Sequence, residues 1–153
     1  MKMLLSIIVV SYNTTALTLD ALESVVENIK KSSFLKGKAE LIVVDNASSD
    51  DSPTKISQFF KKISPELLKT QTIFNKKNLG FAGANNQGIR KSTGKYILLL
   101  NSDTVVQPGA IEKMVETFEN SPIHEKTAHL SSEHKKTDKL GILASTLSQS
   151  RWH

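Results

Sequence analysis

The chain has 153 residues, of which 39% are hydrophobic and 23% are charged; it carries a net charge of +5 and contains no cysteine. This length and balance suit one compact domain and exclude a chain that is disordered throughout, and the missing cysteines exclude disulfides, thiolate metal sites and cysteine nucleophiles. The lysines are scattered and not interleaved with aromatic residues, so we interpret them as a solvated surface and expect no nucleic acid partner.

The first predicted element is the apolar run Leu4–Val10, whose Ile and Val content predicts a strand buried on both faces. The run lacks a cleavage site of small residues and leads into Ser11–Asn13, so a strand fits it better than a signal peptide. No apolar run is long enough to span a bilayer. We therefore expect a cytoplasmic protein, either free or attached peripherally at the inner face of the membrane.

Strands and helices are then predicted to alternate. Asn13–Thr15 can cap a helix whose apolar face carries Leu22, Val25, Val26 and Ile29. A second buried strand, Leu41–Val44, is followed by Pro53, which fits the first turn of another helix. The remaining elements are a short strand at Thr72–Phe74, a turn at Asn78–Gly83, a helix ending near Gly94, a strand at Tyr96–Leu100 and a helix starting at Pro108. This order predicts an α/β domain with a mostly parallel sheet.

The character of the sequence changes at Ser121. Ser121–Lys139 is polar and has little periodicity, which predicts a loop or a poorly ordered segment, and Leu140–Leu143 is compatible with one more short strand. We therefore divide the chain into a domain at residues 1–120 and a polar loop with a short strand at residues 121–153.

Polar clusters follow the predicted strands. They are Ser11–Asn13, Asp45–Asp50 and Asn101–Asp103, and the turn Asn78–Phe81 follows the weaker strand. Ligands of open parallel sheets bind outside the carboxyl ends of the strands, so four such clusters indicate a binding site.

Each cluster also has a simpler interpretation. Asp45–Asp51 can be a helix cap, Tyr12 an ordinary aromatic residue at the edge of the core, and Asp103 a cap of the next helix. The acidic stretch lacks the central glycine and final glutamate of a calcium loop, and the glycines match neither a dinucleotide fingerprint nor a P-loop.

In combination, four strings resemble family 2 glycosyltransferases, and most closely their rhamnosyltransferase-like branch. They are Val9–Asn13, Val43–Ser52, Asn78–Ile89 and Leu98–Thr104. The resemblance runs from about Leu4 to Phe118 and implies a GT-A (Rossmann-like) fold, a mostly parallel sheet flanked by helices, here truncated.

The resemblance also implies a site. Tyr12 would lie against the nucleobase, Asp45 would accept a hydrogen bond from base or ribose, and Asp103 would hold Mg²⁺ or Mn²⁺ at the diphosphate. The full set implied for nucleotide binding is Ser11, Tyr12, Asn13, Asp45, Asn46, Asn78, Gly80, Asn85, Asn101 and Ser102. Asn101 stands where many relatives have the first acid of the D-x-D motif, so Asp103 and the diphosphate would hold the metal.

The activity implied is inverting transfer of a sugar from a dTDP- or UDP-sugar, with dTDP-rhamnose as a candidate, to a glycan or lipid-linked acceptor. The general base normally lies beyond the D-x-D motif, and we expect it, with the acceptor half, to be missing from this chain, which would then be an inactive truncated form. The alternative is a non-catalytic nucleotide-binding module completed by a partner chain. A nucleotidyltransferase and an RNA-binding α/β protein fit less well, because Ser11–Asp20 has neither Gly nor Arg and only the pI suggests RNA.

Overall fold

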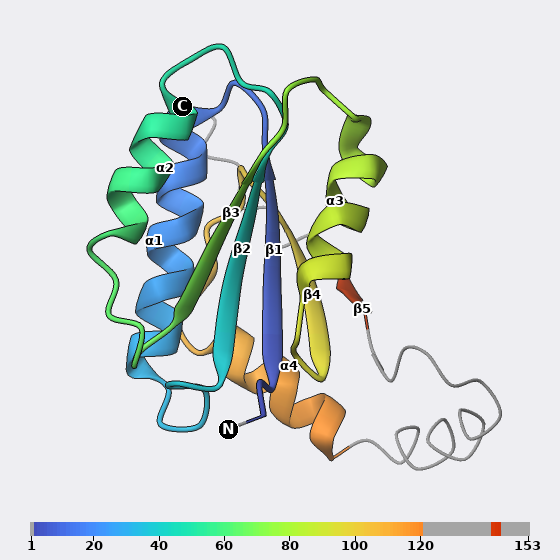
Figure 1. Cartoon of the computed structure of the whole chain (residues 1–153). Coiled ribbons are helices and arrows are strands. Elements are labelled where there is room, and N and C mark those ends of the chain that lie inside the picture. Colours follow the sequence, from blue (N-terminus) through green and yellow to red (C-terminus); the bar gives the residue numbers. More distant parts are fainter. Residues whose placement is uncertain (1, 121–141, 145–153) are drawn as a thin grey trace, which may run out of the picture.

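The computed structural model describes residues 2–120 and 142–144, and this part of the chain alternates regularly between strands and helices (Figure 1). The elements are β1 Leu5–Ser11, α1 Thr15–Lys31, β2 Ala39–Asp45, α2 Ser52–Phe60, β3 Lys69–Phe74, α3 Gly80–Lys91, β4 Tyr96–Asn101, α4 Ala110–Glu119 and β5 Ile142–Ala144. The segment predicted as a polar loop, Ser121–Lys139, lies outside the described residues. None of the described helices is long and apolar enough to cross a membrane.

The five strands form one sheet in the order β3-β2-β1-β4-β5, and every neighbouring pair is parallel. β1 is central: Ile8 lies opposite Ile42 of β2 and Leu99 of β4. Parallel sheets are covered by helices on both faces, so both sides of each inner strand are buried. The sequences of these strands are therefore continuous apolar runs. The predicted α/β class with a parallel sheet is therefore confirmed.

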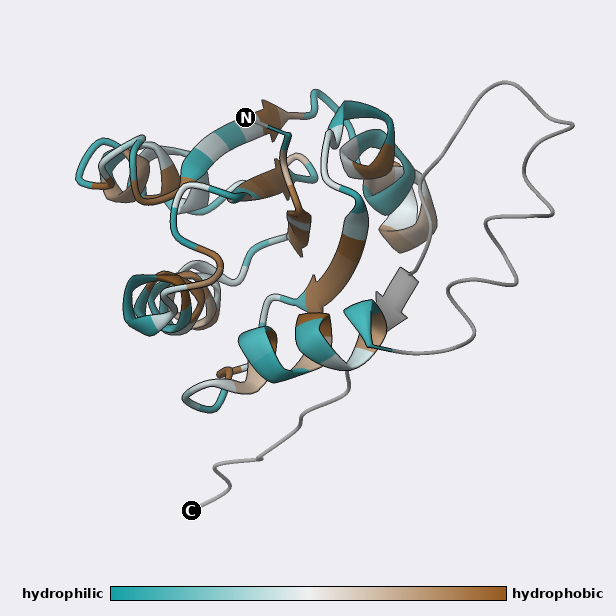
Figure 2. Ribbon diagram, turned by 90° about the horizontal axis from the view of Figure 1, so that it is seen from below, coloured by the Kyte–Doolittle hydropathy of each residue, from teal (hydrophilic) through white to brown (hydrophobic). Residues whose placement is uncertain are grey.

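Helices cover both faces of this sheet. Figure 2 looks along it from below and shows α1 and α2 on one side and α3 on the other. The larger core packs Ile7 and Val9 of β1 with α1, α2 and α4, whereas Ile8 points to the other face, toward Ile89 of α3. Gly88 lets α3 approach β1 closely, because a Cβ at this position would lie 2.5 Å from Ile8 Cγ2.

Several predicted boundaries were wrong. The helix expected after a turn at Asn78–Gly83 already begins at Gly80, whose φ of +73° makes the sharp entry, and it ends at Lys91 rather than near Gly94. The last predicted helix begins at Ala110, because Gly109 has a φ of +76° and separates it from Pro108.

Two strand predictions also shift. β3 starts at Lys69 instead of Thr72, because Lys69–Gln71 pairs with β2 although its residues are polar, as an edge strand allows. The short final strand exists, at Ile142–Ala144 rather than Leu140–Leu143.

The carboxylate of Asp50 joins the starts of α1 and α2. Asp50 Oδ2 accepts the Thr15 backbone N–H at 3.3 Å and the Thr15 hydroxyl at 2.7 Å, while Oδ1 accepts the Ser52 N–H at 3.0 Å. Within the stretch Asn13–Thr15 that was expected to cap α1, Thr14 occupies the N-cap position but makes no side-chain capping bond. Hydrogen bonds from Ser52 and Thr15 lower the pKa of Asp50 to about 2, against a weaker opposing effect of burial.

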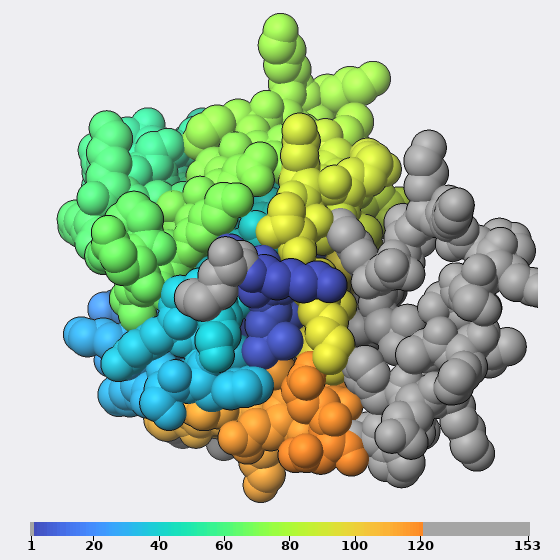
Figure 3. Space-filling view, turned by 60° about the horizontal axis from the view of Figure 1, so that its bottom comes forward, coloured from blue at the N-terminus to red at the C-terminus, as the bar shows by residue number. Residues whose placement is uncertain are grey.

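A buried carboxylate, that of Glu40, fixes the other end of the sheet, which Figure 3 brings forward with the start of the chain in blue. Glu40 Oε1 accepts the Ser6 hydroxyl and the Thr93 N–H, both at 2.5 Å, and Ser6 Oγ in turn accepts the Gly94 N–H at 2.8 Å. This cluster ties together the amino ends of β1, β2 and β4. Leu5 and Ser6 of β1 leave no room for a side chain at Gly94.

Gly94→Ala should lower the free energy of unfolding by at least about 2 kcal/mol, because its Cβ would lie 2.5 Å from the Ser6 backbone nitrogen and 2.7 Å from the Leu5 carbonyl carbon. Gly109→Ala is the matched control: no atom lies within 4 Å of its Cβ, and only the left-handed backbone, at about 1 kcal/mol, opposes it. Urea denaturation followed by circular dichroism compares the two. Equal losses would contradict the packing argument.

Asp50→Asn should lower stability at pH 7 by up to about 1 kcal/mol, since the two helix starts lose a charged acceptor that solvent partly screens. The native pKa of Asp50, about 2, lies below its ordinary value of 3.8, so the extra stability is present above about pH 4 and is lost as the pH falls toward about 2. Urea midpoints measured across this range should converge for the two proteins. Asp20→Asn, an exposed site on α1, is the control, and a gap that does not change with pH would contradict the assignment.

Candidate functional site

The predicted site residues gather at the carboxyl edge of the sheet. The chain runs outward from β1 through β2 to β3 and then crosses to β4 on the other side of β1. In open α/β sheets, ligands bind at such a reversal, in the crevice outside the carboxyl ends of the two strands that flank it, here β1 and β4. The turns after β1, β2 and β4 and the start of α3 surround this position (Figure 1).

Hydrogen bonds lock the turn after β1 to the loop after β2. The Asn13 N–H donates to Ser48 Oγ at 3.0 Å, and Asn13 Oδ1 accepts the Ser49 N–H at 2.7 Å. Both turns contain a left-handed residue, Asn13 at φ 52° and Ala47 at φ 68°. The two loops are therefore fixed relative to each other within this structure, and the side-chain oxygen of Asn13 is already engaged.

Asp45 is the most unusual residue of this edge. It is only 1% exposed, and its Oδ1 accepts the Ser48 N–H at 3.0 Å. Its other oxygen, Oδ2, is buried and has no hydrogen-bond partner among the described residues. Burying a carboxylate oxygen without a donor is costly, so an N–H or O–H from outside these residues would stabilise it.

The neighbouring Asn46 is, in contrast, fully satisfied. Its Nδ2 donates to Asn78 Oδ1 at 2.8 Å and to the Gly80 carbonyl at 3.3 Å. Its Oδ1 accepts Asn75 Nδ2 at 3.1 Å and the Leu79 N–H at 3.0 Å. An asparagine side chain offers two donor hydrogens and one oxygen with two lone pairs, so none remains for a ligand.

The β4 side of the crevice is more open. Asn101 and Asp103 are exposed, and Ser102 Oγ lies 3.4 Å from Thr14 Oγ1, so the turns after β1 and β4 are in contact. The segment after Asp103 is held to α1, because the Val106 N–H donates to Ser24 Oγ at 2.9 Å. Within the described ranges, Asp103 belongs to no group of three carboxylate or imidazole side chains that could hold a metal alone.

The other predicted residues differ in how far their side chains are exposed at this edge. Tyr12 is 47% exposed, as a ring that stacks on a ligand must be. Ser11 is buried and its hydroxyl lies 3.0 Å from that of Thr18. Asn85 is also buried, one turn into α3, and donates to the Phe81 carbonyl at 3.0 Å. The structure thus brings the strand-end residues together but places Asn85 inside a helix.

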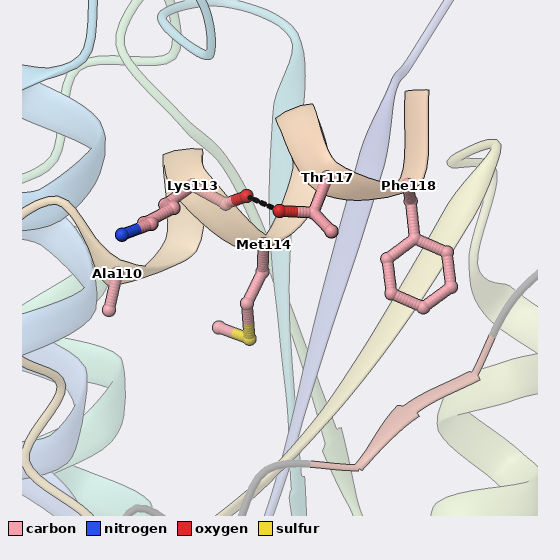
Figure 4. A pocket seen from close by; sticks show the side chains of 5 residues that line it. All are labelled: Ala110, Lys113, Met114, Thr117 and Phe118. Carbon is pink, nitrogen blue, oxygen red and sulfur yellow. Dashed lines mark hydrogen bonds between the residues drawn. The ribbon is translucent and has the colours of Figure 1, made fainter. Parts of the chain in front are cut away.

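A shallow apolar hollow lies elsewhere, along α4. Figure 4 shows Met114 and Phe118 lining it, beside the hydrogen bond from Thr117 Oγ1 to the Lys113 carbonyl. None of the predicted site residues lines it.

Sequence reasoning missed Asn75 and Gln87. Each donates to the other through its amide, at 2.8 and 2.9 Å, and Asn75 also reaches Asn46. Asn75 directly follows β3, as Asn46 follows β2, so the rule that polar residues at strand ends form the site would have found it. Gln87 lies in mid-helix and gave no such signal.

The chain is similar to known proteins in sequence and in fold. Residues 6–124 match the model of the family described as glycosyl transferase family 2. The chain is 33% identical over 116 residues to an uncharacterized glycosyltransferase of Rickettsia bellii, covering 76% of this chain and 15% of that protein.

Two solved structures share the fold. The mannosyltransferase PcManGT from Pyrobaculum calidifontis, in complex with GDP-Man and Mn²⁺, superposes with a TM-score of 0.64 at 23% identity over 77% of this chain and 32% of that one. Residues 1–349 of S. aureus TarS in complex with UDP give a TM-score of 0.64 at 22% identity over 76% and 32%. The chain thus spans less than a third of these solved chains and a smaller share of the R. bellii protein. Its sheet has the GT-A architecture, and the chain belongs to glycosyl transferase family 2.

Proposed function

We propose that this chain carries the donor site of an inverting glycosyltransferase that takes a sugar from a nucleotide diphosphate and transfers it to a glycan or lipid-linked acceptor. The donor is a dTDP- or UDP-sugar, with dTDP-rhamnose favoured by the resemblance to the rhamnosyltransferase-like branch. Residues 1–120 form the nucleotide-sugar-binding unit, and residues 121–153 begin the acceptor region.

The observation that carries this proposal is the unpartnered Oδ2 of Asp45 at the carboxyl edge of β2. A pyrimidine N–H or a ribose hydroxyl is the type of donor that this oxygen lacks. The exposed ring of Tyr12, from the adjacent strand end, provides a face on which a base can stack. Base and ribose would then be recognised by residues from β1 and β2.

The diphosphate belongs on the β4 side of the crevice. Asp103 is an exposed carboxylate there, and hard oxygen ligands suit Mg²⁺ or Mn²⁺. Because no group of described side chains could hold a metal alone, Asp103 fits a cation whose other ligands come from the diphosphate. When bound, such a cation supplies neutralisation of the leaving group's negative charge. Asn101, also exposed, can hydrogen-bond ribose without adding charge.

The candidates for a general base are the acids that follow Asp103, and those among the described residues all lie on α4. Glu112, Glu116 and Glu119 follow Asp103 on α4, and Glu119 pairs with Lys95 beside the amino end of β4, at 2.7 Å. We therefore assign donor binding, and not deprotonation of the acceptor, to the described residues. The alternative, a nucleotide-binding module completed by a partner chain, predicts nucleotide affinity without turnover.

Calorimetric titration with UDP, dTDP and GDP should show binding of at least one nucleotide that strengthens when Mn²⁺ is added. Asp103→Ala should remove most of this metal dependence and weaken binding at least tenfold, because the cation loses its protein carboxylate. Asp20→Ala, an exposed acid on α1, should bind like the wild type. Failure of the wild-type chain to bind any of the three nucleotides would contradict the proposal.

Asp45→Asn should lower nucleotide affinity without lowering the stability of the fold. The amide oxygen of the substituted side chain can still accept the Ser48 N–H, and a neutral amide costs less to bury than a carboxylate, so the free energy of unfolding should stay equal or rise by up to about 1 kcal/mol. Nucleotide affinity should fall at least tenfold, since an amide donor replaces the acceptor that the ligand needs. Urea denaturation and calorimetry measure the two effects. Unchanged affinity would argue that Asp45 has only a structural role.

A further inference from the structure

Four amide side chains form a continuous network behind the start of α3: Asn46, Asn75, Asn78 and Gln87, here called the amide latch. We propose that the latch positions the first turn of α3, Leu79–Gly83, as the wall on the nucleoside side of the donor site, and that it thereby determines which base is accepted. This inference rests on the proposed function. Asn46, Asn75 and Gln87 act in it as positioning residues, without touching the ligand.

Two backbone donors fix the orientation of every amide in the latch. The N–H groups of Leu79 and Gly80 donate to Asn46 Oδ1 and Asn78 Oδ1, at 3.0 and 2.8 Å, so these two atoms must be oxygens. Asn46 Nδ2 then faces Asn78 Oδ1, and Asn75 must present its Nδ2 to Asn46. This leaves Asn75 Oδ1 for Gln87 Nε2. Flipping any one amide would set donor against donor or acceptor against acceptor.

The latch holds α3 at two separate points. Asn46 binds Leu79 and the Gly80 carbonyl at the start of the helix. Asn75 binds Gln87, about two turns further along. Two attachments on a stiff helix fix both its tilt and its rotation, and the close approach of Gly88 to Ile8 fixes its height above the sheet. The direction in which the first turn faces is therefore determined before any ligand arrives.

The positions of Asn46 and Asn75 in the sheet determine which part of the ligand lies beside this wall. Asn46 directly follows Asp45 at the end of β2, and Asn75 follows β3, the edge strand beyond it. Asp103 instead follows β4, which lies on the other side of β1. The wall consequently stands beside the acid that is proposed to bind the base or ribose, and away from the metal acid. Leu79, Gly80 and Phe81 are exposed there and can contact a base.

Gln87→Met tests the proposal, because it keeps the length of the side chain and removes both bonds to Asn75. The control is Asn86→Leu, an equally apolar change at an exposed amide of the same helix. Calorimetry with UDP, dTDP and GDP in the presence of Mn²⁺ should show about a tenfold loss of affinity for the preferred nucleotide, with a smaller loss for the others. Preference among the bases should thus decrease in Gln87→Met and stay unchanged in Asn86→Leu.

A merely structural role predicts a different result. Partial unfolding lowers the number of binding sites per chain, whereas a displaced wall raises the dissociation constant at full stoichiometry. Amide hydrogen exchange supplies a second measurement: exchange of the Leu79 and Gly80 N–H groups should accelerate in Gln87→Met and not in the control. Asn46→Asp, which removes both donors at the other end of the latch, should reproduce the loss of base preference if Gln87→Met does not fold.

The outcomes separate the two proposals. A wild-type chain that binds no nucleotide overturns the proposed function and this inference with it. A wild-type chain that binds, together with Gln87→Met and Asn46→Asp variants that keep both its affinity and its base preference, overturns the inference alone. Equal weakening for every nucleotide, with base preference unchanged, also contradicts it.

Discussion

The parallel pairing of β1 with both β2 and β4 is the constraint on which the rest of the structure depends. It places the carboxyl ends of three strands at one edge of the sheet, so that turns far apart in the sequence meet there. It also requires the chain to cross β1 after β3. This crossing is made by α3, which covers the opposite face of the sheet from α1 and α2. The crevice, and with it the candidate site, follows from this one topological requirement.

The edge is ordered by its own polar groups. Asp50 joins the starts of α1 and α2, Asn13 joins the first two turns, and the amide latch holds the start of α3. Within this satisfied network, the buried Oδ2 of Asp45 is the exception. A site whose surroundings are rigid and whose recognition group is unsatisfied loses stability when empty and gains it when a ligand supplies the missing donor. Asp45 differs in this respect from Asp50, both of whose carboxylate oxygens accept hydrogen bonds.

Much of this could be predicted from the sequence, and the rest could not, for physical reasons. Apolar runs in the sequence located β1, β2 and β4, because buried strands consist of apolar residues. The polar residues that follow each run identified the carboxyl edge of the sheet. The start of α3 was misplaced because a glycine with positive φ looks the same in a turn and at a helix entry. The hydrogen-bond partners of Asn46 and Gln87 could not be predicted, because the sequence does not indicate whether an amide side chain contacts a ligand or another amide. The assignment of nucleotide contacts to individual residues stays a prediction.

The most direct test of the central claim is a titration of the ¹⁵N-labelled chain with UDP and dTDP in the presence of Mg²⁺, followed residue by residue by NMR. The account predicts that backbone amide shifts change at Ser11–Asn13, Asp45–Ser48 and Asn101–Asp103 together, because one ligand spans the crevice between β1 and β4. Shift changes confined to α4 or to the amino ends of the strands, or no changes with either nucleotide, would contradict it.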